Sequence, residues 1–373
     1  MTAVADPVAA QPPGSAGGRH RVRTAVTLMA ALLAAGALLI GGHHENRPPV
    51  ASQRLSIGQA WPRAARADLP NLLVTPKLFL NATTAVGTVP TRDGTFLRLA
   101  VETADGRQRE LHRLPADVNP QFDNVTAAGD ELIWTEATDR RRLQLWTTNL
   151  RTGGPARRLT ADTGHALFFG TQDDLVVAGG RVYWTAAPDS DRARATQIRS
   201  VALTGGPVRV REEPGEWALT AWPWLTDNPA APSSTVRLRN MDSGRDVQVA
   251  TSGVESSTCT PTWCRVLVMA GDRLARIDVM HPDGSGRRRV AGSGAQAAVA
   301  DVALLDRFEI LAEPHPDSDL TGTASLLVYD ISTGRTVTVS AAAGGAFTGN
   351  GMLWWSTGDP DNLVWHTLDL RTA

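Results

Sequence analysis

Alternating apolar and polar positions dominate the chain from Leu72 onward, and the spacing typical of an amphipathic helix is hard to find there. The alternation is clear at Leu143–Leu150 and Arg335–Ser340. Glycine turns such as Asp93-Gly94 and Gly205-Gly206 separate these runs. The pattern therefore predicts short strands joined by tight turns, and an all-β domain.

One unit recurs along this domain. Residues 129–160 and 179–211 share a glycine turn, an apolar run ending in Trp-Thr, a polar loop, an alternating run and Thr-Gly-Gly-Pro. A strand of one type recurs at Leu97, Leu143, Ile198, Val236, Leu274, Leu326 and Leu363. Seven copies over residues 70–373 average about 43 residues, the length of a four-stranded propeller blade. This predicts a seven-bladed β-propeller; six blades of about 51 residues, or a pair of β-sandwiches, are the alternatives.

The last copy leaves the predicted ring open. Its strand, Leu363–Leu370, is followed only by residues 371–373, so it has no outer partner. Asn71–Thr75 precedes the first blade and has the composition of a strand. We therefore expect Leu72–Val74 to pair with Leu363–Leu370 as the fourth strand of the last blade, which removes an exposed strand edge.

The N-terminal part has a different composition. Residues 1–23 are small and polar, which predicts a disordered cytoplasmic tail. Residues 24–42 are uncharged and follow three arginines, which predicts a transmembrane helix with the rest of the chain outside the cytoplasm. A cleaved signal peptide is the alternative, and it also exports the propeller. Residues 43–69 contain prolines among polar residues and are interpreted as a flexible linker.

Short motifs in the repeat resemble those of known propeller families. Val182–Thr185 resembles the YWTD blade motif, and Ile133–Thr135 is a weaker copy. Arg157–Thr160 is similar to the blade ends of TolB-like propellers. The resemblance implies an exported bacterial β-propeller. Glu136 and Ala186 stand where the YWTD motif has its aspartate, so the inter-blade contacts of that aspartate do not carry over.

Composition narrows the class of partner. The net charge is −1, which gives no overall field to attract nucleic acid, and we expect no nucleic-acid partner. Lys77 is the only lysine, and this arginine bias with abundant alanine resembles actinobacterial proteins. Cys259 and Cys264 are the only cysteines, too few for a four-thiolate zinc site. In an exported domain they are expected to form a disulfide.

Two side-chain clusters are candidate ligand-binding residues. An aromatic platform for a sugar ring or an aromatic peptide could form from Trp217, Trp222 and Trp224, although packing between blades accounts for them as well. Anionic wall polymers or lipid headgroups could contact Arg140, Arg141 and Arg142, or a second triplet at residues 287–289. Solvated strand edges are the alternative explanation for both triplets.

The sequence contains no nucleophile elbow, zinc-protease or phosphate-loop motif, and it assigns no catalytic residue. Glu313–Asp319 is acidic but lacks the spacing of a calcium loop, and no metal or cofactor is expected. We interpret the protein as a membrane-anchored, extracytoplasmic propeller that binds or scaffolds an envelope protein or glycan. The alternative is an exported enzyme acting on envelope glycans or peptides, which carboxylates converging in a central pocket with shifted pKa values would favour.

Overall fold

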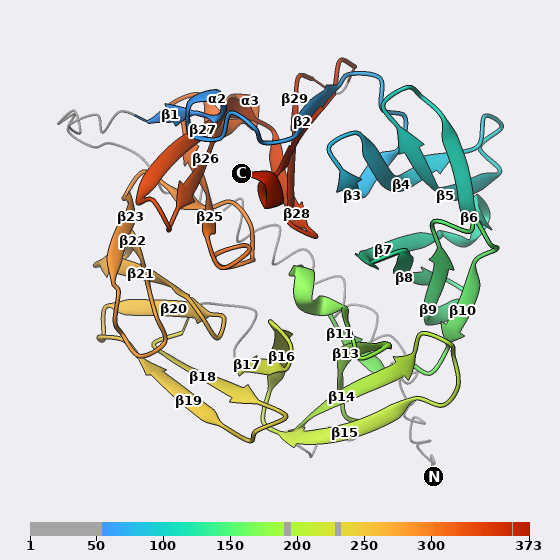
Figure 1. The fold of residues 1–373 in the computed structure, drawn as a ribbon, viewed down its shortest axis with the longest axis horizontal. Coiled ribbons are helices and arrows are strands. Elements are labelled where there is room, and N and C mark those ends of the chain that lie inside the picture. Colours follow the sequence, from blue (N-terminus) through green and yellow to red (C-terminus); the bar gives the residue numbers. More distant parts are fainter. Residues whose placement is uncertain (1–53, 190–194, 228–232, 360) are drawn as a thin grey trace, which may run out of the picture. The chain divides into compact units, whose positions relative to one another are not determined.

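The computed structural model describes residues 54–189, 195–227, 233–359 and 361–373. Seven sheets surround a central axis (Figure 1), so the predicted seven-bladed β-propeller is confirmed and the six-bladed and sandwich alternatives are wrong. The predicted tail at 1–23, the predicted membrane helix at 24–42 and residues 43–53 of the predicted linker lie outside the described residues. Within the described ranges, no helix has the length and apolar character to cross a membrane.

The first three blades run from innermost to outermost strand in chain order, with antiparallel neighbours. The first blade consists of β3 (Thr75–Asn81), β4 (Thr84–Pro90), β5 (Phe96–Thr103) and β6 (Gln108–Pro115). The second consists of β7 (Gln121–Ala128), β8 (Glu131–Thr138), β9 (Arg141–Asn149) and β10 (Arg157–Thr160). In the third, two short strands share the inner position, and its members are β11 (His165–Leu167), β12 (Val176–Ala178), β13 (Arg181–Ala187), β14 (Ala195–Ala202) and β15 (Arg209–Pro214).

The fourth, fifth and sixth blades continue in the same order. The fourth consists of β16 (Trp217–Thr220), β17 (Trp224–Asp227), β18 (Thr235–Asn240) and β19 (Asp246–Ala250). The fifth consists of β20 (Glu255–Cys259), β21 (Cys264–Ala270), β22 (Arg273–Met280) and β23 (Arg288–Gly292). The sixth contains β24 (Gln296–Ala297), β25 (Phe308–Pro314), β26 (Ala324–Asp330) and β27 (Arg335–Ala343). The recurring strand predicted from the sequence is the third strand of each of these blades.

The two ends of the domain meet in the seventh blade. The C-terminal part supplies β28 (Gly345–Gly349), β29 (Met352–Thr357) and β30 (Val364–Asp369), and the N-terminal part supplies the outermost strand, β2 (Arg66–Leu69). Strand β2 is antiparallel to β30, with Arg66 opposite Leu368 and Leu69 opposite Trp365. In Figure 1 the blue strand β2 lies beside the red strands of this blade. Closure of the last blade by an N-terminal strand is therefore as expected.

The segment expected to close the ring was wrong, however. The strand that pairs with β30 is Arg66–Leu69 and not Leu72–Val74. The backbone N–H groups of Leu73 and Val74 donate instead to the Glu102 carboxylate in the first blade, at 3.2 and 2.9 Å. Because β3 begins at Thr75, residues 70–74 are needed to cross from the rim of the last blade to the inner edge of the first.

Residues of the predicted linker also extend the sixth blade. Strand β1 (Leu55–Ser56) pairs in parallel with β27, and the one-turn helix α2 (Ile57–Ala60) follows it. The Ser56 hydroxyl accepts from the Gln59 N–H, and the Gln59 side chain accepts from the Ser56 N–H. These two reciprocal bonds form a capping box at the N-terminus of the helix. Arg54 forms an ion pair with Glu313 at 2.5 Å. Residues 54–69, assigned to a linker from the sequence, thus form β1, α2 and β2 of the propeller.

The hydrophobic core lies between neighbouring blades. Each of six clusters joins side chains of adjacent sheets, because a single blade cannot bury both of its faces. The tryptophans of the YWTD-like motifs fill these layers: Trp134 packs between the first two blades and Trp184 between the second and third. Both side chains have no exposed surface. These motifs therefore stabilise the stacking of blades.

The predicted disulfide between Cys259 and Cys264 is confirmed. The two residues are opposite each other at the ends of β20 and β21, with a Cα–Cα distance of 4.0 Å. Both are buried in the cluster between the fourth and fifth blades. The bond therefore joins one hairpin at its turn and does not link separate blades.

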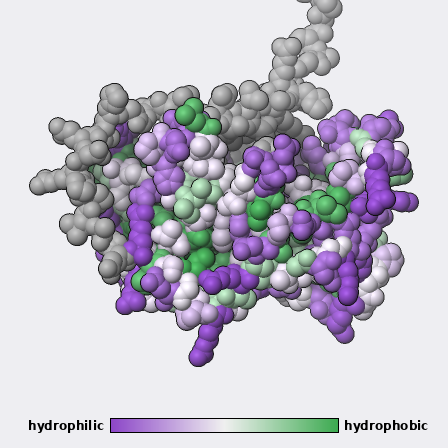
Figure 2. All heavy atoms as spheres, turned by 90° about the horizontal axis from the view of Figure 1, so that it is seen from above, coloured by the Kyte–Doolittle hydropathy of each residue, from purple (hydrophilic) through white to green (hydrophobic). Residues whose placement is uncertain are grey.

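The surface of the ring is largely polar in the view of Figure 2, where hydrophilic residues predominate and hydrophobic residues form smaller groups among them. The large hydrophobic side chains that are exposed, such as Leu73, Val254 and Leu320, come from different blades. A pocket is therefore a clearer indication of a specific binding site than these scattered apolar side chains.

Ring closure can be tested at Ala67. The Asp369 N–H donates to the Ala65 carbonyl at 2.8 Å, and hydrogen-bonded pairs alternate along antiparallel strands, so Ala67 and Thr367 form the next such pair. Ala67→Pro removes this N–H and is expected to lower the free energy of unfolding by about 3 kcal/mol or more in denaturant titrations.

Ala67→Ser is the matched control, because it retains the N–H at similar size. We expect it to unfold close to the wild type. If the proline variant is as stable as the serine variant, the β2–β30 pairing does not close the ring.

The disulfide can be tested with the Cys259→Ala, Cys264→Ala double variant. Its closed loop is short, so loss of the cross-link is expected to cost about 2 kcal/mol of unfolding free energy. Denaturant titration of both proteins with and without a reductant measures this. The reductant should destabilise the wild type and leave the double variant unchanged; equal sensitivity would contradict a structural bond.

Candidate functional site

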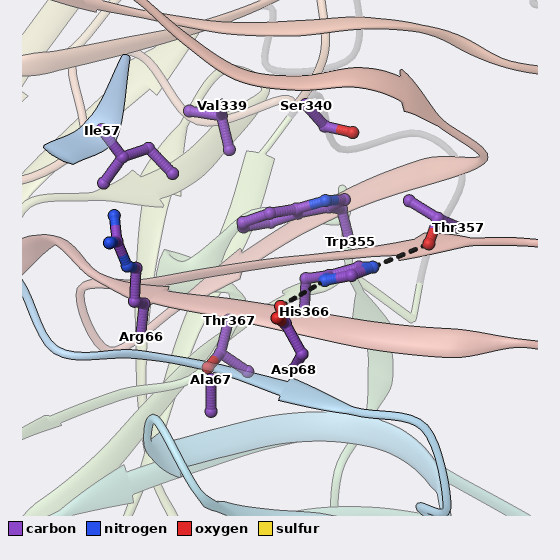
Figure 3. Close-up of a pocket in the computed structure, with 10 residues that line it drawn as sticks. All are labelled: Ile57, Arg66, Ala67, Asp68, Val339, Ser340, Trp355, Thr357, His366 and Thr367. Atoms are coloured by element: carbon purple, nitrogen blue, oxygen red, sulfur yellow. Dashed lines mark hydrogen bonds and ion pairs between the residues drawn. The ribbon is translucent and has the colours of Figure 1, made fainter.

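A pocket of about 620 Å³ lies between the sixth and seventh blades. The seventh blade contributes strands β2, β29 and β30, and the sixth contributes β27 and helix α2 (Figure 3). Its wall consists of Ile57, Arg66, Ala67, Asp68, Val339, Ser340, Trp355, Thr357, His366 and Thr367. The N-terminal segment that closes the ring therefore also forms one side of the pocket.

Strand register brings the polar side chains together. His366 is opposite Asp68 on one neighbouring strand and opposite Trp355 on the other. Side chains directly opposite each other lie on the same face of a sheet, and residues two apart on one strand share that face. Thr357, two residues after Trp355, therefore joins the row. One blade face thus presents a carboxylate, an imidazole, an indole and a hydroxyl.

Two hydrogen bonds connect three of these groups. The Asp68 Oδ1 atom lies 2.6 Å from His366 Nδ1, and the Thr357 hydroxyl lies 2.7 Å from His366 Nε2 (Figure 3). An ionised carboxylate can only accept, so Nδ1 carries the proton and Nε2 is free to accept from the hydroxyl. The Trp355 indole stacks on the imidazole, with ring centroids 5.4 Å apart and an angle of 15°. The side chain of His366 is 18% exposed and that of Asp68 is 80% exposed.

The remaining wall combines a cation with apolar groups. Arg66 is exposed, and among the described residues no carboxylate lies within ion-pair distance of its guanidinium. Figure 3 shows this group at one end of the pocket, near Ile57, and Thr357 at the other end. Ile57 and Val339 pack against the apolar cluster that also contains Trp355. The pocket is therefore suited to an anionic group attached to an apolar body.

The three tryptophans predicted as a platform do not form one surface. Trp217 is buried at 2% exposure, and its indole N–H donates to the Pro214 carbonyl at 2.8 Å. The Trp222 ring packs against that of Tyr183, with centroids 3.9 Å apart and an angle of 39° between the planes. Trp224 packs against the cluster of the next blade interface. Packing between blades accounts for these positions, and a ligand-binding role for them stays a prediction.

The arginine triplets are exposed, and some of their guanidinium groups are already ion-paired. Arg140, Arg141 and Arg142 are all exposed; the first lies 3.7 Å from Asp117 and the second 3.8 Å from Glu136. Arg287 is bound by two carboxylates, those of Glu255 and Asp278. Neither triplet borders the pocket between the sixth and seventh blades. An anion-binding role for Arg140–Arg142 stays a prediction.

Three aspartates gather near the central axis. Asp173 and Asp174 belong to the 3-10 turn η2 (Gln172–Asp174) in the third blade, and Asp301 belongs to the sixth. Asp301 accepts from the Gln172 N–H at 3.0 Å and from the Thr348 hydroxyl at 2.6 Å. Asp173 accepts from the Ala221 N–H at 3.2 Å. The turn is thereby bonded directly to the fourth and sixth blades, and through Asp301 it is linked to the seventh.

Burial raises the pKa of Asp173 and of Asp174 to about 6, and it also raises the pKa of Asp301. Carboxylates with such pKa shifts in a central pocket would favour an enzyme. The oxygens of Asp174, however, accept from the N–H groups of residues 169–171, and Asp301 is bonded through both of its oxygens. These carboxylates therefore hold the turn in place and are poorly placed for proton transfer to a substrate.

The remaining features near the axis give a weaker site. A second pocket of about 160 Å³ is lined by residues of the first, second, third and seventh blades, including Lys77 and Asp174. Lys77 is already paired with Asp123 at 2.8 Å. Among the described residues, no group of three or more His, Cys, Asp or Glu side chains is arranged to hold a metal ion. The larger pocket between the blades is the better candidate.

Sequence reasoning missed the residues of this pocket. His366 and Trp355 lie on strands that the alternation identified, but nothing in their spacing indicated that they are neighbours. Arg66 and Asp68 fall in the segment interpreted as a linker. The signal that could have located them was the missing outer strand of the last blade, since any segment filling it must lie beside His366.

Comparisons with known proteins find distant structural likenesses. No protein-family model matches the sequence, and no curated protein does. A structure from a study of two prolyl endopeptidases is 12% identical, with a TM-score of 0.46, over 79% of this chain and 46% of that one. The tricorn protease is 10% identical, with a TM-score of 0.48, over 83% and 34%. An uncharacterized protein of Listeria monocytogenes is 9% identical, with a TM-score of 0.49, over 83% and 92%.

These likenesses concern the propeller fold and carry no activity over to this chain. The chain spans about half the length of the prolyl endopeptidase and about a third of the tricorn protease. The comparisons indicate no lineage for this chain.

The central aspartates give a prediction of pH dependence. The pKa of Asp173 is raised from 3.8 to about 6 on folding, so its favourable contribution is present below pH 3.8 and is lost as the pH rises through about 6. Asp173→Asn removes the charge and keeps an acceptor for the Ala221 N–H. When the pH is raised from about 4.5 to about 7.5, we expect the unfolding free energy of the variant to increase by about 2 kcal/mol relative to that of the wild type.

Denaturant titrations of both proteins at the two pH values measure this difference, and the contributions of titrating groups that do not interact with Asp173 cancel. Asp123→Asn is the matched control, because its carboxylate is half exposed and paired with Lys77. A difference between Asp173→Asn and the wild type that does not change with pH would contradict a buried, protonated Asp173.

Proposed function

We propose that this propeller is a binding module for the carboxyl end of a peptide chain, held in the pocket between the sixth and seventh blades. Arg66 binds the carboxylate, and Ile57, Val339 and Trp355 contact the apolar side chain next to it. The observation that carries the proposal is the Arg66 guanidinium, which has no carboxylate partner among the described residues. It lies at one end of a pocket of about 620 Å³ whose wall includes the apolar side chains of Ile57, Val339 and Trp355.

The chemistry of the wall favours a peptide end over other anions. A guanidinium binds a carboxylate through two parallel hydrogen bonds, and it does so more strongly than a neutral donor would. The apolar part of the wall offers few partners for the many hydroxyls of a sugar, whereas a Leu or Val side chain suits it. The Ser340 and Thr367 side chains leave polar positions for the peptide backbone.

We further propose that the module works at the outer face of a cell membrane. The support is the uncharged run at residues 24–42 with its preceding arginines, which would anchor the chain and export the propeller. Removal of this run by a signal peptidase would give a secreted form with the same pocket. The partner would then be an envelope protein or peptide with a free carboxyl end.

The binding proposal is tested with acetyl-Ala-Ala-Ala-Leu, as the free acid and as the C-terminal amide. We expect the acid to bind and the amide to bind much more weakly in calorimetric titrations. Arg66→Ala should weaken binding of the acid roughly tenfold to a hundredfold, the value of one charged hydrogen-bonded contact, and should leave the amide unaffected.

Arg63→Ala is the matched control, since Arg63 is exposed on the same segment and does not line the pocket. It should bind the acid like the wild type. Equal affinity for acid and amide, or an Arg66→Ala variant that binds normally, would overturn the proposal. Tighter binding of a glucuronic-acid disaccharide than of the peptide would identify a glycan site instead.

A further inference from the structure

We propose that the same pocket cleaves esters that carry a carboxylate, with Thr357 as nucleophile, His366 as general base and Asp68 as the residue that positions the imidazole. The inference rests on the proposed function for one element, the binding of the substrate's free carboxylate by Arg66. The hydrolytic step itself depends only on the Asp68, His366 and Thr357 side chains.

Geometry distinguishes His366 from the other described histidines. Its Nδ1 is bonded to a carboxylate at 2.6 Å and its Nε2 to a hydroxyl at 2.7 Å, the arrangement that a nucleophile and its base require. Residues 68, 357 and 366 come from three strands of one blade, so the sheet register fixes their relative positions. The stacked indole of Trp355 restricts rotation of the imidazole.

A second histidine of this protein provides the contrast. His315 Nε2 also lies near a hydroxyl, that of Ser325, at 3.1 Å. The same nitrogen lies 2.8 Å from the Ala341 carbonyl, to which it must donate, so it has no lone pair to accept a proton. Among the described residues, no carboxylate forms an ion pair with His315. Only the His366 arrangement can therefore deprotonate its hydroxyl.

The reaction balances without a further reagent. The Thr357 Oγ1 atom attacks the ester carbonyl carbon as its proton passes to His366 Nε2. The bond to the alcohol oxygen breaks, and the alcohol leaves with that proton. Water then attacks the acyl-threonine, again giving a proton to His366 Nε2. This proton returns to the Thr357 oxygen as the acid is released, and the net change is one ester and one water to one acid and one alcohol.

The layout of the pocket indicates which esters fit. Arg66 lies at one end and Thr357 at the other, with Trp355 and His366 between them (Figure 3). A substrate that reaches both ends has a carboxylate at one end, an apolar middle and an ester at the other. Monoesters of dicarboxylic acids meet this description and serve as probes.

The test uses the folded protein with 4-nitrophenyl hydrogen adipate and, as the uncharged comparison, 4-nitrophenyl hexanoate. We expect release of 4-nitrophenolate above that of heat-denatured protein. His366→Gln and Thr357→Val should each lower the rate roughly 100-fold or more, the usual contribution of a general base or nucleophile. Thr357→Ser should retain turnover, and mass spectrometry after acid quenching should find an adipoyl group on Thr357.

Further variants separate catalysis from binding and from folding. His315→Gln is the matched control and should hydrolyse like the wild type, and thermal melts should show that each variant is folded. Asp68→Asn should displace the pH–rate profile, which a merely structural role would not do. Arg66→Ala should raise KM for the adipate ester and leave the hexanoate ester unchanged.

Each outcome separates the two proposals. If folded His366→Gln releases 4-nitrophenolate as fast as the wild type, the hydrolytic proposal is wrong, while peptide binding stands on its own titration. If hydrolysis requires His366 and Thr357 but the Arg66→Ala variant hydrolyses both esters like the wild type, the proposed catalytic residues are supported. The proposed carboxylate site at Arg66 is then wrong.

Discussion

Backbone pairing between the N-terminal strand β2 and the C-terminal strand β30 is the constraint on which the rest of the structure depends. Seven four-stranded blades close into a ring only if the last has an outer strand, and β2 fills this place beside β30. An unpaired edge would expose N–H and C=O groups of β30 and would remove Leu69 from the core that the first and last blades share. Residues 66–69 therefore join parts of the chain that lie about as far apart in sequence as the domain permits.

The closing strand has a second consequence, because its side chains become part of a site. Arg66 and Asp68 alternate with Ala67, so they point to the face of β2 that looks toward the sixth blade. The helix α2, capped by Ser56 and Gln59, places Ile57 on the other side of the same space. Polar groups that would be unremarkable on a linker are thus positioned beside His366 and the indole of Trp355. A ligand in this pocket would contact both ends of the ring at once.

The sequence predicted the fold further than it predicted the site. The repeated strand, the glycine turns and the need to fill each blade indicated seven blades and closure by an N-terminal strand, and Cys259 and Cys264 are bonded as expected. The closing segment was misplaced because Leu72–Val74 has strand composition, whereas two of the four residues of Arg66–Leu69 are charged, as an outermost strand permits. What composition could not show is that five residues are required to reach β3, and that the Glu102 carboxylate holds Leu73 and Val74. The site residues are brought together by this pairing, so they could not be predicted once the closing strand was assigned to the wrong segment. The tryptophans at 217, 222 and 224 pack at blade interfaces, and a ligand-binding role for them stays a prediction.

Hydrogen exchange measured residue by residue, with and without acetyl-Ala-Ala-Ala-Leu, tests most directly whether the closing strand and the binding site are one element. A ligand that bridges the sixth blade and β2 should slow exchange at the amides of Ala67 and Thr367 in the β2–β30 ladder. Amides of Val236 and Val249, paired across β18 and β19 in the fourth blade, should not change. Protection at Ala67 and Thr367 that is absent with the peptide amide is the predicted result. Unchanged exchange at those two positions under saturating acid, or equal slowing in the fourth blade, would contradict the account.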